Sequence, residues 1–180
     1  FQNKRMAFVI KKVSEHGTSN PIVARLAVQT HEMIQFFHIA KDKQDRVLEI
    51  YINSVKPRLL HCMELSDTVT HEVEVIRKRI LNDDLPSQPD SRVIELPQVS
   101  RLSEQAETYL YNTKSSLRDL SLVFEPLFGA QFAHSRYNEI RNWAEGQFGA
   151  EAPLTKLLTA DEPWIKHVVT MRNAVEHPEG

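Results

Sequence analysis

The sequence predicts an all-α protein built as an antiparallel helical bundle. Apolar residues recur at intervals of three, four and seven positions along most of the 180-residue chain, which is the spacing of one helix face. Only five glycines are present, which favours long helices over a fold of strands and turns. No stretch alternates apolar and polar residues as a half-buried strand does. We therefore expect about six or seven helices.

The N-terminal half is expected to supply helices followed by a linker. Amphipathic spacing predicts a short helix over residues 1–16 and a second over 21–40, with a polar interruption at Lys41–Asp45. The pattern then resumes, and Pro57 begins a further helix because proline is tolerated in a first helical turn. The acidic and proline-rich stretch 82–97 breaks regular structure and predicts a linker.

The C-terminal half is expected to supply three helices. The first covers residues 100–125 and stops at Pro126, and the second covers 132–147. The third begins at Asp161, which can cap a helix, and is followed closely by a proline. The apolar stripes that we expect to face the core are Leu102, Ala106, Tyr109, Thr113, Leu117, Leu120 and Phe124 on the first helix, and Trp164, Val168, Met171 and Val175 on the third.

Composition limits the functions open to this chain. The net charge is −2, so no chain-wide positive field exists to grip a long duplex, and any contact with nucleic acid must be local. The single cysteine, Cys62, excludes an internal disulfide and is consistent with a reducing compartment. No apolar run is long enough to span a membrane, and no signal peptide is recognisable. We therefore expect a cytoplasmic protein.

Motifs for metals and for phosphate loops are missing. His31-Glu32 and His71-Glu72 each begin like a zinc-protease motif, but neither has the second histidine four residues after the first. No glycine-rich phosphate loop occurs either. We therefore expect neither a metal nor a cofactor.

The strongest functional signal is the segment 172–177, which reads Arg-Asn-Ala-Val-Glu-His. Histidine titrates near neutral pH and can accept or donate a proton, whereas arginine stays charged and binds phosphate oxygens. Pro178 disfavours a helical conformation for the residue before it, so the helix should end at or before His177, whose side chain can then turn back beside Arg172. A second Arg–His pair, Arg25 and His31, lacks a polar residue after the arginine.

The Arg-Asn-x-x-x-His pattern of residues 172–177 resembles the signature of the HEPN superfamily, the higher eukaryotes and prokaryotes nucleotide-binding domains. The resemblance implies a four-helix bundle in which residues 98–180 supply three helices. The fourth would come from residues 21–81 or from beyond Gly180, where the bundle is expected to continue. Residues 1–97 match nothing in the family and would pack on the bundle or extend it.

The same resemblance implies a function. HEPN proteins are commonly metal-independent endoribonucleases of toxin–antitoxin or phage-defence systems, and they usually form homodimers in which two Arg–His motifs face one cleft. Arg172 and His177 would then be catalytic, Asn173 would orient them or bind RNA, and the product would carry a 2′,3′-cyclic phosphate. An antitoxin or a nucleotidyltransferase is a possible partner. However, Glu179 stands where one family branch carries the tyrosine associated with nucleotidyltransferase partners.

Two alternatives stay open on the residues alone. In the first, the chain is a non-catalytic HEPN-like helical dimer that binds a nucleotide, RNA or a protein partner. In the second, the motif has no shared role, because Arg172 only reaches from a core helix to solvent and His177 lies in a surface turn.

Overall fold

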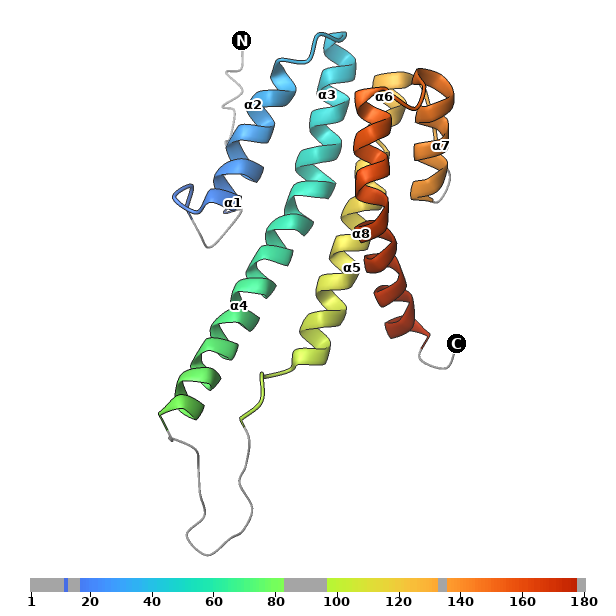
Figure 1. Ribbon diagram of the computed structural model, residues 1–180. Coiled ribbons are helices and arrows are strands. Elements are labelled where there is room, and N and C mark those ends of the chain that lie inside the picture. Colours follow the sequence, from blue (N-terminus) through green and yellow to red (C-terminus); the bar gives the residue numbers. More distant parts are fainter. Residues whose placement is uncertain (1–11, 13–16, 83–96, 133–135, 178–180) are drawn as a thin grey trace, which may run out of the picture.

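The computed structural model describes residues 12, 17–82, 97–132 and 136–177, and within these residues the protein is all-α, as predicted (Figure 1). The predicted helix over 1–16 and most of the predicted linker lie outside the described residues. The described elements are α1 (Pro21–Val23), η1 (Ala24–Gln29), α2 (Thr30–Gln35), α3 (Lys41–Ile50), η2 (Tyr51–Val55), α4 (Lys56–Leu81), α5 (Leu102–Ser121), α6 (Phe124–Phe128), α7 (Tyr137–Phe148) and α8 (Pro153–Glu176), of which η1 and η2 are π-helical.

Three long helices, α4, α5 and α8, form the frame of the bundle. Helix α4 packs against α5, α5 packs against α8, and the shorter α7 packs against α8. In Figure 1 the chain descends through α4, ascends through α5 and descends again through α8, so neighbouring helices in this frame are antiparallel. The N-terminal half therefore meets the C-terminal half mainly where α4 packs against α5.

The segments α3, η2 and α4 form one unbroken helical rod, and two predictions for this region were wrong. Lys41–Asp45 is the start of α3 rather than an interruption, and Pro57 does not begin a separate helix. Gln44 explains the first difference, because its side-chain amide is buried and donates to two carbonyl oxygens at the end of α2, at 3.0 and 2.7 Å. The π-helical segment η2 ends at Val55, two residues before Pro57, and such a local widening accommodates a residue that cannot donate a backbone hydrogen bond.

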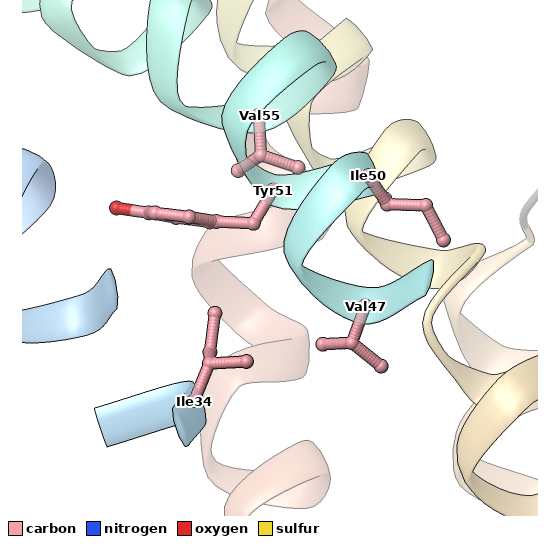
Figure 2. Close-up of a cluster of buried hydrophobic side chains, with 5 residues drawn as sticks. All are labelled: Ile34, Val47, Ile50, Tyr51 and Val55. Carbon is pink, nitrogen blue, oxygen red and sulfur yellow. The ribbon is translucent and has the colours of Figure 1, made fainter. Parts of the chain in front are cut away.

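A first hydrophobic core joins α2 to this rod. Figure 2 shows its five buried side chains, with that of Ile34 on α2 facing those of the rod. The hydroxyl of Tyr51 extends beyond the cluster and donates a hydrogen bond to the carbonyl oxygen of Leu26. Burial of this apolar surface holds the N-terminal helices against the long rod. The core residues are Ile34, Val47, Ile50, Tyr51 and Val55.

A second hydrophobic core joins α6, α7 and the beginning of α8. Its buried residues are packed against an aromatic cluster in which Trp143 meets Phe124 edge to face, with ring centroids 5.7 Å apart. Gly149 ends α7 with a positive φ of 85°, a conformation that a residue with a β-carbon adopts only with strain. The chain then turns back into α8. The buried residues of this core are Phe124, Ile140, Ala144 and Leu158.

The apolar stripe predicted for α5 is buried only at its last residue, Phe124, which the structure places in α6. Leu102, Tyr109 and Leu120 are exposed, and the buried face of α5 consists largely of small or polar residues. Asp119 on that face accepts a hydrogen bond of 3.0 Å from the guanidinium of Arg58 on α4. A buried face made of serine and aspartate leaves no apolar periodicity in the sequence, which is why the stripe prediction was wrong. The buried residues of α5 are Leu110, Ser115, Ser116, Asp119 and Ser121.

Helix α8 begins eight residues earlier than predicted. It starts at Pro153, continues through Pro163, and uses Asp161 to accept a hydrogen bond from the Trp164 indole at 3.0 Å rather than to cap the helix. Leu158 is buried in the second core, so packing holds the first turns helical despite the internal proline.

The predicted stripe of α8 is also largely exposed. We call Leu157, Trp164, Met171 and Val175 the outer face of α8, because each side chain is at least 42% exposed. The face that is buried carries Thr155, Leu158 and Ile165 instead. The prediction was wrong because the positions of α5 and α7, rather than the apolar spacing, decide which side of α8 is covered.

Candidate functional site

The motif of residues 172–177 lies at the end of α8. The helix continues through Glu176, and His177 follows it as the C-cap residue with φ −131° and ψ 68°. The backbone amide of His177 still donates to the carbonyl oxygen of Asn173, at 2.9 Å. The motif is therefore one helical turn and its cap, so the backbone fixes where each of its side chains starts.

Arg172 lies between α8 and α5. Its side chain is only 15% exposed, and its guanidinium forms an ion pair with the carboxylate of Glu176, one turn further along α8. The guanidinium carbon also lies 6.0 Å from the ring centroid of Tyr111 on α5, within the range of a cation–π contact. Tyr111 has a second such neighbour, Arg58 of α4, at 5.9 Å. Arg172 is thus held by contacts from two helices rather than extended into solvent.

Asn173 contacts α5 through a second polar pair. The ammonium group of Lys114 donates a hydrogen bond of 3.0 Å to Oδ1 of Asn173. Partial burial, and then the positive charge of Arg172, lower the pKa of Lys114 below its ordinary value. Two cations from different helices, Lys114 and Arg172, therefore lie close enough at the motif for the charge of one to affect the other.

These residues line a cleft of about 880 Å³ between α5, α8 and the start of α7. Five cationic side chains and two carboxylates, those of Glu162 and Glu176, line it, which gives an excess of three positive charges in a chain whose net charge is −2. Positive charge is thus concentrated here, as local binding of an anion requires. The cationic residues of the cleft are Lys114, Arg118, Arg136, Lys166 and Arg172.

Not every cation in the cleft is available to a ligand. Arg118 pairs with Asp119 at 2.9 Å, and Arg136 pairs with Glu139 at 3.7 Å. Neither carboxylate partner lines the cleft. Arg172 is paired inside the cleft, with Glu176. A bound phosphate would therefore compete with existing ion pairs at these three arginines.

Tyr137 gives the cleft a neutral hydrogen-bond donor. Burial, followed by the nearby carboxylates of Asp161 and Glu162, raises the pKa of Tyr137 to about 12. Glu162 is in turn paired with Arg141 of α7 at 3.2 Å. The Tyr137 hydroxyl accordingly keeps its proton throughout the physiological pH range.

The three residues predicted from the motif do not all reach the cleft. Arg172 and Asn173 line it, whereas His177 is exposed and is not among the lining residues. The structure therefore brings Arg172 and Asn173 together with Lys114, and leaves His177 at the adjacent helix end.

Sequence reasoning missed the residues that α5 and α7 contribute to the cleft. Lys114 and Tyr111 lie one turn apart on α5, and Tyr137 begins α7. No motif connects these positions with residue 172, and only the packing of α5 against α8 brings them together. These residues could have been found from the sequence only if the buried face of α5 had been assigned correctly.

Other candidate sites are weaker. Among the described residues, no group of three or more His, Cys, Asp or Glu side chains could hold a metal ion. Cys62 is buried, its Sγ lies 3.5 Å from the Thr113 hydroxyl, and burial raises the pKa of its thiol, which lowers its reactivity. No helix in the described ranges combines the length and the apolar character needed to cross a bilayer.

Comparison with protein-family models, with curated proteins and with solved structures finds no match to this chain. The motif and the geometry of the cleft are therefore the features that bear on function.

Proposed function

We propose that this chain is a HEPN-type, metal-independent endoribonuclease that holds RNA in the cleft between α5 and α8. The observation that carries the proposal is the position of Arg172. The motif arginine lines a cleft with an excess of three positive charges, although the whole chain is slightly acidic. A locally basic cleft suits a phosphodiester backbone, since phosphate contacts supply most of the affinity for nucleic acid.

The reaction proposed for the motif is an intramolecular transesterification of the RNA backbone. His177 removes the proton of a ribose 2′-hydroxyl, and the resulting oxygen attacks the adjacent phosphorus. The bond from phosphorus to the 5′-oxygen breaks, that oxygen takes up a proton from water, and a 2′,3′-cyclic phosphate remains. Arg172 stabilises the charge that develops on the phosphoryl oxygens. Asn173 orients the groups around it.

The proposal includes a homodimer. His177 lies outside the cleft of its own chain, so the reaction requires either rotation of this exposed side chain or a histidine supplied by a second copy. The outer face of α8 supports the second arrangement, because it presents Trp164, Met171 and Val175 to solvent beside the motif. Two-fold pairing along this face would bring two motifs towards one another, as the HEPN resemblance implies.

A non-catalytic role is the second candidate, and one observation favours it. Arg172 and Lys114 already form a cation pair in the cleft without His177, which is an arrangement suited to binding alone. In this alternative the chain binds RNA, a nucleotide or a protein partner without turnover. Under either reading, a cytoplasmic toxin–antitoxin or phage-defence setting is a proposal that depends on the resemblance.

The test is cleavage of labelled single-stranded RNA by the purified chain in excess EDTA. We expect cleavage by the unmodified chain, and no cleavage of an oligonucleotide with 2′-deoxyribose at the cut site, because the nucleophile is missing. Arg172→Ala should lower the rate at least about 100-fold. Arg77→Ala is the matched control, since Arg77 is exposed on α4 and away from the cleft, and it should keep the full rate.

Two results would reject the enzymatic proposal. Loss of activity in EDTA, or equal cleavage of the deoxy substrate, would exclude this mechanism. Binding of RNA that depends on Arg172, with no cleavage under any condition tested, would establish the non-catalytic alternative instead.

A further inference from the structure

The cleft contains a cation that no motif predicts. Within the described part of the chain, the ammonium of Lys114 has no carboxylate partner, and its hydrogen bond goes to the neutral side chain of Asn173. Arg118, Arg136 and Arg172 each have a carboxylate partner. Lys114 is also partly buried, unlike a solvated surface lysine. Its charge is therefore poorly compensated by the protein itself.

The surroundings of Lys114 disfavour its charged form, even though Glu176 pairs with Arg172. Like charges on neighbouring groups oppose one another, and partial burial removes some of the water that would otherwise screen them. Both effects lower the pKa of Lys114. A phosphate group between the two cations would reverse both effects, because it supplies negative charge and accepts hydrogen bonds from each.

Asn173 fixes where Lys114 points. An ammonium group has only donors, so the Asn173 atom that faces it must be the carbonyl oxygen Oδ1. The amide nitrogen of Asn173 then keeps its two donors for a ligand in the same cleft. The asparagine of the motif is thus hydrogen-bonded to a lysine of another helix.

We propose that Lys114 is the second phosphate-binding cation of this site, positioned by Asn173 so that it and Arg172 bind one phosphodiester group of an RNA strand. The identity of the ligand as RNA rests on the proposed function. The inference that Lys114 and Arg172 together bind an anion does not depend on the proposed function.

The experiment measures binding separately from cleavage. The probe is a fluorescein-labelled single-stranded 2′-O-methyl RNA, which has no free 2′-hydroxyl and cannot be cut by the proposed reaction. Fluorescence anisotropy gives Kd for the full chain over a range of salt concentrations. Lys114→Gln removes the charge, Lys114→Arg keeps it, and Lys156→Gln is the matched control because Lys156 is an exposed lysine of α8 outside the cleft.

We expect Lys114→Gln to weaken binding about tenfold, as the loss of one charge-assisted hydrogen bond does. The slope of log K against log salt should fall by about 0.7, the value for one phosphate contact on a single strand. Lys114→Arg should keep most of the salt slope of the unmodified chain. Lys156→Gln should change neither Kd nor the slope. Asn173→Ala should weaken binding while leaving the salt slope unchanged, because it disorders Lys114 without removing its charge.

A second probe separates this inference from the proposed function. Inorganic pyrophosphate should raise the thermal midpoint of the unmodified chain and of Lys114→Arg, but not that of Lys114→Gln. If pyrophosphate binds through Lys114 and RNA does not bind, the anion site stands and the proposed function fails. If RNA binding requires Arg172 but is unchanged in Lys114→Gln, the proposed function stands and this inference is overturned. If neither probe binds, both are overturned.

Discussion

The two halves of α8 differ in what surrounds them. The N-terminal half carries Leu158, which is buried among the apolar side chains of the second core. The C-terminal half carries Arg172 and Asn173, which meet α5 through a cation–π contact and a hydrogen bond beside a charged cleft. One helix therefore combines a segment that supports folding with a segment available for binding, so substitutions along it should separate stability from activity.

The largest expected effect falls on the C-terminal half. His177→Ala should lower the rate of RNA cleavage about 10²- to 10⁴-fold, the usual contribution of a general acid or base. The free energy of unfolding should hardly change, because His177 is an exposed cap residue. Cleavage assays and chemical denaturation measure the two quantities. His167→Ala is the control, since His167 is exposed on the same helix outside the cleft. Full activity in His177→Ala would exclude His177 from catalysis.

The next largest effect falls on the N-terminal half. Leu158→Ala should lower the free energy of unfolding by about 2–5 kcal/mol, because it leaves a cavity in the second core. Leu157→Ala, one residue earlier and 58% exposed, should change it by less than about 0.5 kcal/mol. Urea denaturation of both variants tests the contrast. Equal destabilisation by the two would show that the assignment of the buried face of α8 is wrong.

The outer face of α8 offers a test of assembly that spans both halves. Trp164→Glu should convert a dimer into a monomer in light scattering at micromolar concentration, since it places a charge in an apolar contact. Its effect on the stability of the single chain should be about 1 kcal/mol, because Trp164 is 46% exposed and loses one hydrogen bond, to Asp161. Val73→Glu, on an exposed position of α4, should leave the mass unchanged. A monomeric unmodified chain would remove the dimer from the proposal.

The smallest effect concerns the pH dependence of stability that comes from Tyr137, which lies near Asp161 and Glu162 in the middle of α8. Because the pKa of Tyr137 is raised from 10.0 to about 12 in the folded protein, its contribution to stability is complete below pH 10 and is lost as the pH rises towards 12. The folded state holds the phenol proton over that interval, whereas the unfolded state releases it. Tyr137→Phe should therefore lose less stability than the unmodified chain between pH 10 and 12. Thermal midpoints measured across that interval check the difference, and identical profiles would contradict it.

The two wrong stripe predictions, on α5 and on α8, have a common physical cause. The stripe from Trp164 to Val175 has ideal helical spacing, and it correctly indicated a helix. Spacing reports which residues share a face, but it does not report which face another helix covers. On α5 the covered face holds serines and Asp119, which compensate for burial with hydrogen bonds and with the ion pair to Arg58. Such a face has no apolar signature, so periodicity selected the wrong side.

The sequence by itself determined the all-α class, the existence of a helix through residue 172, and the presence of an arginine and an asparagine suited to phosphate binding. These properties depend on local spacing and on side-chain chemistry, both of which can be read along the chain. Tertiary structure alone decided that Lys114 and Tyr111 stand beside the motif, that His177 lies outside the cleft, and that Trp164 faces solvent. The physical reason is that these relations join residues more than fifty positions apart, or depend on which side of α8 is covered by α5 and α7.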